Sequence, residues 1–275
     1  LVFQPSEEGP PAGEEGGASL MVEEGVLREP EVSAIFGLHV APDLPTGKLA
    51  YRAGGLMASV DRFTVTLRGR QSHAAMPWQS VDPIVVAAHA ITAIQTISSR
   101  KIDARQPVVV SVGVIQGGQV WNIIPEQVVL EGTVRTHDEA VRVEVLRLFR
   151  QLVEQTATAH GAQAEIEFSD YGPPVWNDPE LVARMKPALV SALGEANVVE
   201  SPPVMVGEDF AHYQQEIPGM FVFLGVRNEA AGAVHSLHTP QFVLDEAALP
   251  VGIRTMGQLA IDYLRSKTAE PPPAK

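Results

Sequence analysis

The hydrophobic pattern of the chain changes near Ser59, and this change limits the possible folds more than any other feature. From Asp61 to Arg68 apolar and polar residues alternate, which is the period of a half-buried antiparallel strand. The segment that follows predicts helices at 83–97 and 139–158 and strands at 108–115, 128–136 and 164–168. This β-α-β-β-α-β order is the ferredoxin-like arrangement. We therefore predict a small α+β domain over residues 59–169, inserted into the rest of the chain.

The residues on either side of this insertion predict one α/β domain, formed by residues 1–58 and 170–267. Its expected elements are a strand at 1–3, a helix at 18–24, strands at 34–40 and 220–224, and helices at 179–193 and 245–264. Asp178 and Pro179 are expected to cap the start of the helix at 179–193. A strand, a helix and a strand in that order are typical of a parallel sheet. The last residues, 268–275, contain three successive prolines and are expected to be disordered.

Charge and composition exclude several classes of protein. Asp and Glu number 33 against 20 Lys and Arg, and the resulting net charge of -13 repels nucleic acid and anionic lipid surfaces. Cysteine is absent, so disulfides and thiolate zinc sites are excluded and any metal must be bound by His, Asp or Glu. The chain has no apolar segment long enough to span a membrane and no signal core at its start. We therefore expect a soluble, cytoplasmic protein.

Four residues with the chemistry of a metal centre follow predicted strands of the α/β domain. Glu7 and Glu8 come after the first strand, His39 ends the second, and His238 follows the strand at 220–224. The carboxyl ends of parallel strands border the ligand crevice of such a sheet. Carboxylate and imidazole donors are those that a catalytic zinc or manganese ion requires. Because adjacent carboxylates diverge, one can be a metal ligand and the other the general base for a metal-activated water.

Each of these residues also has a simpler interpretation. A Glu pair in a Gly-rich loop is usually solvated surface, and a single strand-end His is usually a hydrogen-bonded core residue. Other catalytic signatures are missing. The segment GASLM at 17–21 lacks the final Gly of a nucleophile elbow, and neither HExxH nor a phosphate-binding loop occurs. The combination of carboxylates and imidazoles at strand ends therefore favours a metal centre over serine or nucleotide chemistry.

Seven motifs of the chain occur in the same order in one protein family. They are LVFQPSEEG at 1–9, GLHV at 37–40, SHAAMP at 72–77 followed by Asp82-Pro83, NIIP at 122–125, GTVR at 132–135, GEDF at 207–210 and LHTP at 237–240. On these motifs the sequence resembles the metallopeptidase-like amidohydrolases, which include hippurate hydrolases, N-acyl-amino-acid deacylases and auxin-conjugate hydrolases. The resemblance implies a zinc-exopeptidase-like α/β catalytic domain with an inserted ferredoxin-like lid and dimerisation domain.

The resemblance also implies roles for residues of the α/β domain. Glu7 resembles the general base, and Glu8, His39 and His238 resemble metal ligands. We interpret Asp209 as a carboxylate that supports a ligating imidazole, because such a ring needs a partner that fixes its tautomer. The implied cofactor is a divalent metal, two zinc or manganese ions in complete family members. The implied activity is hydrolysis of the amide bond of N-acyl amino acids.

In the inserted domain the resemblance implies roles for three residues. His73 resembles the lid His that polarises the scissile carbonyl, reaching the site of a partner subunit. Asn122 and Arg135 resemble residues that bind the substrate, with the Arg holding its carboxylate. The alternatives are a surface His, a turn-forming Asn and an exposed strand Arg. The implied partners are an N-acyl amino acid and a second copy of the chain, in a homodimer formed through the lid domain.

The sequence departs from the family at its beginning. Family members carry an upstream segment of the His-Ala-Cys-Gly-His-Asp type with further metal ligands, and no such segment occurs in these 275 residues. We therefore expect a catalytic domain that is incomplete at its N-terminus, with one metal ion or none bound by Glu8, His39 and His238. Two alternatives to the hydrolase remain. One is a truncated, inactive homologue that retains the dimerisation domain, and the other is a protein that binds carboxylates through Arg135 and Asn122 without hydrolysis.

Overall fold

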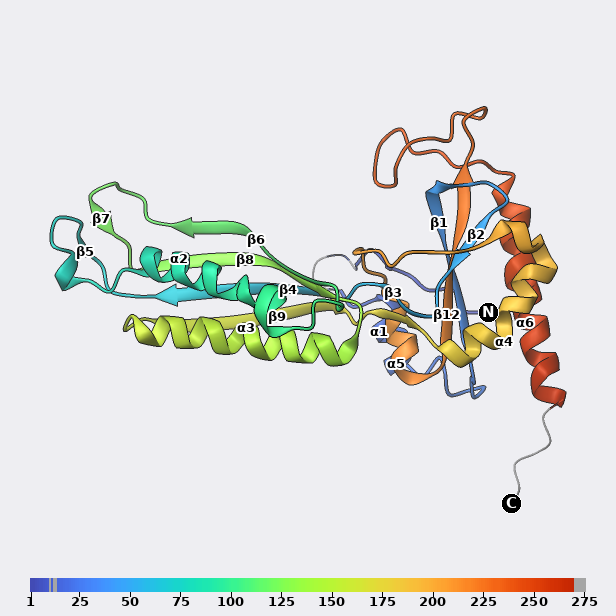
Figure 1. The fold of residues 1–275 in the computed structure, drawn as a ribbon, viewed down its shortest axis with the longest axis horizontal. Coiled ribbons are helices and arrows are strands. Elements are labelled where there is room, and N and C mark those ends of the chain that lie inside the picture. The colour runs from blue at the N-terminus through green and yellow to red at the C-terminus, as the bar shows by residue number, and fades with distance from the viewer. Residues whose placement is uncertain (10, 12–13, 270–275) are drawn as a thin grey trace, which may run out of the picture. The chain divides into compact units, whose positions relative to one another are not determined.

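The computed structural model describes residues 1–9, 11 and 14–269, and the chain divides into two compact units (Figure 1). Unit 1 consists of Leu1–Leu56, Val175–Val204 and the chain from Asp209 onward. Unit 2 consists of Met57–Pro174 and Met205–Glu208. No helix of the described chain is both long enough and apolar enough to cross a lipid bilayer.

A mixed four-stranded sheet in the order β1-β12-β2-β11 forms the centre of unit 1. β1 (Ile35–Pro45) runs parallel to β12 (Gly219–Arg227), which is antiparallel to β2 (Leu49–Tyr51), and β11 (Val198–Glu200) is parallel to β2. β12 is buried along nearly its whole length, which explains why its apolar residues form a continuous series without alternation. The strands predicted at 34–40 and 220–224 are confirmed, and both are longer than predicted.

Two long helices pack on the face of this sheet that carries Met220 and Val222. They are α4 (Pro179–Leu193) and α6 (Ala248–Ala269). α4 begins where the side chain of Asp178 accepts a hydrogen bond of 2.7 Å from the N–H of Leu181, as the sequence predicted. The remaining short elements of the segments that form unit 1 are α1 (Gly17–Glu23), β3 (Gly54–Met57), β10 (Val175–Asn177), the 3-10 turn η3 (Glu195–Asn197) and α5 (Ala211–Glu216).

The sheet of unit 2 has the strand order β6-β8-β4-β9, and every neighbouring pair is antiparallel. Its elements are β4 (Val60–Arg68), β5 (Ser72–His73), η1 (Pro77–Gln79), α2 (Pro83–Ile94), the π turn η2 (Ile97–Lys101), β6 (Val108–Gly117), β7 (Ile123–Ile124), β8 (Gln127–Thr136), α3 (Glu139–Ala159) and β9 (Gln163–Gly172). The β-α-β-β-α-β order that the sequence predicted is present. β5 and β7 form a separate two-stranded ladder beyond the ends of β4 and β8.

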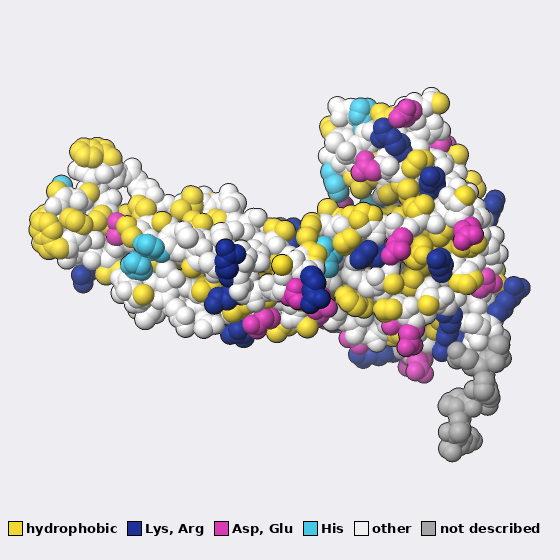
Figure 2. Space-filling view, viewed as in Figure 1, with side chains coloured by type: hydrophobic (Ala, Val, Ile, Leu, Met, Phe, Trp, Pro, Cys, Tyr) yellow, Lys and Arg dark blue, Asp and Glu magenta, His cyan; other side chains and the backbone are white. Residues whose placement is uncertain are grey.

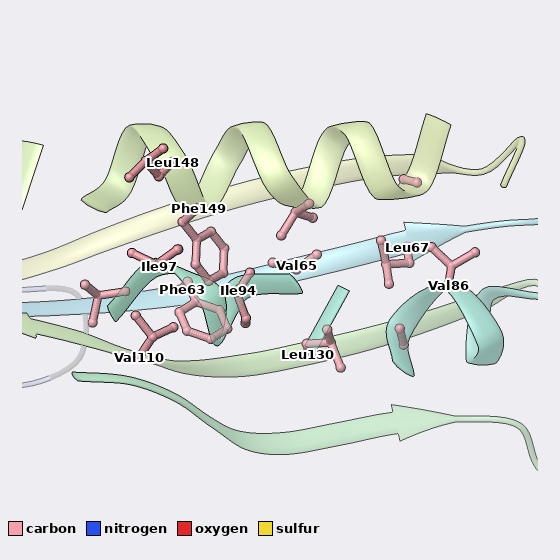
Figure 3. Packing of buried hydrophobic residues seen from close by; sticks show 14 of the residues in the cluster. Phe63, Val65, Leu67, Val86, Ile94, Ile97, Val110, Leu130, Leu148 and Phe149 are labelled. Carbon is pink, nitrogen blue, oxygen red and sulfur yellow. The ribbon is translucent and has the colours of Figure 1, made fainter. Parts of the chain in front are cut away.

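The two helices α2 and α3 cover one face of this sheet, and the core of unit 2 lies between them and the strands (Figure 3). Phe63 of β4 and Phe149 of α3 meet at the middle of this core with their ring centres 4.6 Å apart. Near the start of β4 on the same face, the buried carboxylate of Asp61 pairs with the guanidinium of Arg142 at 2.7 Å. The residues that alternate with these on β4, such as Thr64, point to the opposite face, as the period of two requires.

Three predicted elements differ from the structure. Residues 1–3 form no strand, because no described strand lies beside them, and Phe3 is 85% exposed. The closing helix begins at Ala248 rather than at residue 245 and continues to Ala269, so residues 268 and 269 of the predicted disordered tail are helical. The rest of that tail, residues 270–275, lies outside the described residues.

A hydrogen-bond network fixes the N-terminal segment to unit 1 in place of a strand. The side-chain amide of Gln4 donates to both carboxylate oxygens of Asp209, at 2.8 and 2.7 Å, and accepts a bond of 2.9 Å from the hydroxyl of Tyr213. The N–H of Ala18 donates to the same carboxylate at 2.8 Å. Asp209 therefore joins the first residues of the chain, the start of α1 and α5.

The environment of Tyr213 predicts a loss of stability in alkali. Burial, and then the charge of Asp209, raise the pKa of Tyr213 from 10.0 to about 12. Because the folded pKa exceeds the unfolded one, the stabilisation that results is fully present below pH 10 and is lost as the pH rises through 12. We expect the free energy of unfolding to fall by up to about 3 kcal/mol over this range.

Urea unfolding at a series of pH values tests this expectation. In Tyr213→Phe the fall between pH 10 and 12 should be largely absent. Tyr263→Phe, which removes a hydroxyl bonded to Ser33 instead, is the matched control and should keep the fall. An equally steep fall in Tyr213→Phe would show that another group is responsible.

Candidate metal centre

Glu7 and Glu8 lie in a tight turn of the N-terminal segment that Gln4 and Asp209 hold in place. Ser6 adopts a φ of 59°, and the N–H of Gly9 donates to the carbonyl of Ser6 at 3.1 Å to close the turn. The side chain of Glu8 is 71% exposed, whereas Glu7 is half-buried. The turn therefore places two adjacent carboxylates in different environments, as their different predicted roles require.

His238 lies beside Glu8. The Nε2 atom of His238 is 3.7 Å from Oε1 of Glu8. His238 adopts a φ of 58° in the loop after β12, a left-handed conformation that is uncommon for a residue other than glycine and that costs free energy. Two ligand atoms on one zinc ion, each about 2.0–2.1 Å from the metal, lie about 3–4 Å apart. The observed spacing has the size that a shared cation needs.

The imidazole of His39 is held in one tautomer. Its Nδ1 atom lies 2.7 Å from the carbonyl oxygen of Val40, and because a carbonyl only accepts, Nδ1 carries the proton. Nε2 therefore presents a lone pair. An N–H bond to a backbone carbonyl on one ring nitrogen is what orients a metal-ligating His for binding through the other nitrogen.

The electrostatics of Glu7 link it to the other three residues. Burial, followed by the charges of Glu8 and Asp209, raises the pKa of Glu7, while His39 and His238 lower it. A carboxylate oxygen of Glu7 also lies within 4.8 Å of one of Asp209. The structure therefore brings the pair Glu7 and Glu8 into one neighbourhood of unit 1 with His39 and His238, which are 31 and 230 positions further along the chain than Glu8.

The donors of this neighbourhood suit a single divalent cation. Glu8, His39 and His238 offer one carboxylate and two imidazoles, which is the number of protein ligands in a catalytic zinc site. Within the described part of the chain, their ligand atoms do not all lie within 4.8 Å of one another. Because the side chains of Glu8 and His238 are 71% and 73% exposed, both can rotate toward a common ion without disturbing the core.

The structure assigns Asp209 a different task from the one that we expected. Its carboxylate accepts bonds from Gln4 and Ala18 rather than from an imidazole. The tautomer of His39 is fixed by the carbonyl of Val40 instead. Gln4 and Tyr213 were not identified from the sequence, although Gln4 stands inside the motif at 1–9. No local sequence pattern marks the role of Gln4, because its hydrogen-bond partner Asp209 is 205 residues away.

In unit 2, His73 and Asn122 lie on neighbouring segments. His73 of β5 pairs with Ile123 of β7, and the N–H of Ala74 donates to the carbonyl of Asn122 at 2.9 Å. The N–H of Ala75 donates to Nδ1 of the His73 ring at 3.1 Å. Because this bond makes Nδ1 an acceptor, the ring proton of neutral His73 lies on Nε2, the opposite tautomer to that of His39.

Arg135 lies on β8, and only part of its guanidinium is hydrogen-bonded. Its Nε atom donates to the hydroxyl of Thr133 at 3.0 Å, and its two terminal nitrogens bond to no described side chain or backbone group. Burial lowers the pKa of Arg135, and the charge of Asp61 opposes that shift. A half-buried guanidinium with unused donors is an environment that favours binding of an anion.

Arg135 is distant from His73 and Asn122 within unit 2. Arg135 is near one end of β8, and the β5-β7 ladder lies beyond the other end, which begins at Gln127. The eight residue-to-residue steps from Gln127 to Arg135 span about 27 Å at about 3.4 Å per step. One small substrate therefore cannot contact Arg135 and His73 of the same chain.

Comparison with known proteins places these residues in a family. The family model described as Peptidase family M20/M25/M40 matches residues 1–262. An N-acetyl-L-cysteine deacetylase from Bacillus subtilis is 40% identical over 249 residues, which are 90% of this chain and 56% of that protein. IAA-amino acid hydrolase ILR1-like 5 from Arabidopsis thaliana is 38% identical over 275 residues, with 98% of this chain and 62% of that protein covered.

The fold has the same relatives. The crystal structure of a Bacillus subtilis protein described as a dinuclear metal binding peptidase from the M20 family superimposes with a TM-score of 0.76 and 37% identity, over 96% of this chain and 64% of that one. The chain thus spans 56% and 62% of the length of the two curated relatives above. Because the family match includes every candidate ligand and all of unit 2, the chain belongs to the peptidase family M20/M25/M40.

Proposed function

We propose that this chain forms part of a metal-dependent hydrolase that cleaves the amide bond of N-acyl amino acids. The observation that carries the proposal is the pair of opposite imidazole tautomers. His39 presents a lone pair, which suits a metal ligand, and His73 presents an N–H, which suits a donor to a carbonyl oxygen. The relatives named above as a deacetylase and an amino acid hydrolase support the same class of substrate.

Glu8, His39 and His238 are the residues that would hold the cation. A divalent cation bound there polarises a carbonyl and lowers the pKa of water. Glu7 takes a proton from the attacking water and delivers it to the leaving amine. The burial that raises the pKa of Glu7 favours this task, because a general base is most effective when its pKa approaches the working pH.

His73 and Arg135 bind two different groups of the amide substrate in this proposal, the scissile carbonyl and the carboxylate. The Nε2–H of His73 donates to the carbonyl oxygen, where negative charge develops as water adds. The free terminal nitrogens of Arg135 form the two-pronged contact that a carboxylate accepts. Asn122, next to His73 in the β5-β7 ladder, supplies a further amide donor.

The distance between Arg135 and His73 requires two copies of the chain at one substrate. We infer a homodimer in which His73 of one subunit serves the substrate of the other. The edge strand β6 suits the interface, because it is an outer strand of the unit 2 sheet. Val114 and Ile115 on this strand are 37% and 57% exposed. Unpaired strand edges with exposed apolar residues are templates for pairing with another chain.

Removal of the proposed base should abolish turnover without loss of metal. In the holoenzyme, Glu7→Gln should reduce the rate of amino acid release from N-acyl amino acids by at least about 100-fold, because the general base is lost. Metal content per chain, measured by plasma emission spectroscopy, should stay unchanged. Glu15→Gln, an exposed carboxylate of the same segment, is the control and should retain full activity. Release at the parent rate by Glu7→Gln would contradict the assigned role.

Arg135→Met should weaken the recognition of the substrate carboxylate. We expect kcat/KM for an N-acyl amino acid to fall by about 100-fold, since one partner of a charge-assisted pair is removed. The corresponding N-acyl amino acid amide, which lacks the carboxylate, should be cleaved equally by both proteins. Arg62→Met, an exposed Arg of the same sheet, is the control. Calorimetric binding of N-acyl amino acids through Arg135 without any turnover would instead favour a carboxylate-binding protein.

The dimer is tested at the edge of the sheet. Ile115→Lys should raise the dimer dissociation constant by at least tenfold, because a buried charge in the interface is unpaired. Sedimentation velocity measures the change. Val143→Lys on α3, where the side chain is 60% exposed, is the matched control and should leave the dimer intact. A monomeric wild-type protein at all concentrations would rule out the proposed interface.

A further inference from the structure

Two adjacent turns surround His73. One turn closes with a bond from the N–H of Met76 to the carbonyl of His73 at 2.8 Å, and the other with a bond from Ile123 to Val120 at 3.2 Å. The bond from Ala74 to the carbonyl of Asn122 joins them. We call residues 73–76 and 120–123 the tip turns. His73 therefore has the second turn as its immediate neighbour.

The tip turns and the short helix η1 expose an unusual amount of apolar surface. The exposed fractions are 38% for Met76, 74% for Trp78, 49% for Val120, 93% for Trp121 and 39% for Ile123. Figure 2 shows hydrophobic side chains gathered at the end of unit 2 that carries β5 and β7 in Figure 1. Residues 71–81 and 115–125 contain no charged side chain. The two segments around His73 thus have no charged side chain of their own and expose several large apolar ones, and the nearest cation along the chain is Arg70, which donates to the carbonyl of Gln79.

Trp121 leaves a large apolar side chain in contact with water, which is energetically unfavourable. An indole brings a large apolar area to any contact, and aromatic side chains left in water mark binding surfaces. Trp121 is at the corner of the second tip turn and directly precedes Asn122, whose carbonyl bonds to the residue after His73. Backbone hydrogen bonds of both turns hold this position, so the indole is presented from a fixed backbone.

From these contacts we infer that Trp121 is a specificity-determining residue that binds the acyl group of the substrate. The inference rests on the proposed function, in which His73 donates to the scissile carbonyl. That carbonyl belongs to the acyl group, so the groups beside His73 are placed to contact the rest of it. A largely apolar surface that includes an exposed indole selects a bulky, apolar acyl group, aromatic or aliphatic, over a small or charged one.

The test compares two substrates of one amino acid, N-phenylacetylglycine and N-acetylglycine. In the holoenzyme, Trp121→Ala should lower kcat/KM for the phenylacetyl substrate by about tenfold and change that for the acetyl substrate less than twofold. Trp176→Ala removes a 41% exposed tryptophan of unit 1 instead, outside the apolar surface of the tip turns and η1, and is the control. It should leave the ratio of the two substrates unchanged. An unchanged ratio in Trp121→Ala, or an equal loss on both substrates, would overturn the inference.

A binding measurement separates this inference from the proposed function. Calorimetry in the Glu7→Gln background gives the dissociation constants of both compounds without turnover. Addition of Trp121→Ala should weaken binding of N-phenylacetylglycine by about tenfold and leave N-acetylglycine unchanged. If the wild-type holoenzyme cleaves neither compound, the proposed function is wrong. The role of Trp121 is then still decided by the ratio of the two dissociation constants with and without the substitution. Equal affinities before and after the substitution would defeat the inference alone.

Discussion

The carboxylate of Asp209 is the constraint on which the candidate metal centre depends. The first nine residues belong to no strand, so the sheet does not position Glu7 and Glu8. Their position follows from Gln4, which donates to both oxygens of Asp209, and from Ala18, whose N–H shares one of them. These bonds are largely shielded from water, where an unpaired carboxylate is costly, and each partner therefore stabilises the others.

Glycine at position 17 is part of the same constraint. A Cβ atom at this position would lie 2.7 Å from a carboxylate oxygen of Asp209, and the φ of Gly17 is 76°. Both the space and the backbone conformation therefore require the absence of a side chain. The carboxylate can approach the start of α1 closely only because residue 17 is glycine, and the segment that carries Glu7 is held by that approach.

His39 and His73 show how the surroundings of a side chain can give one residue type two different chemical roles. A neutral His has one donor and one acceptor, and the partner of Nδ1 decides which function Nε2 retains. The carbonyl of Val40 makes His39 a lone-pair donor in unit 1, and the N–H of Ala75 makes His73 a proton donor in unit 2. The long β8 strand then separates His73 from Arg135, which is the geometric reason for a second copy at each substrate in the proposed function.

The sequence by itself determined the residue types and the local elements. Alternation over 61–68 predicted β4, Asp178 predicted the start of α4, and the carboxylates and imidazoles at strand ends indicated metal chemistry; these depend on periods and caps within a few residues. Only the tertiary structure decided that residues 1–3 form no strand, that Gln4 and Tyr213 hold Asp209, and which nitrogen of His39 and of His73 carries the proton. Those outcomes depend on which group lies beside each side chain in space, sometimes from 205 residues away, and no local period encodes such a neighbour.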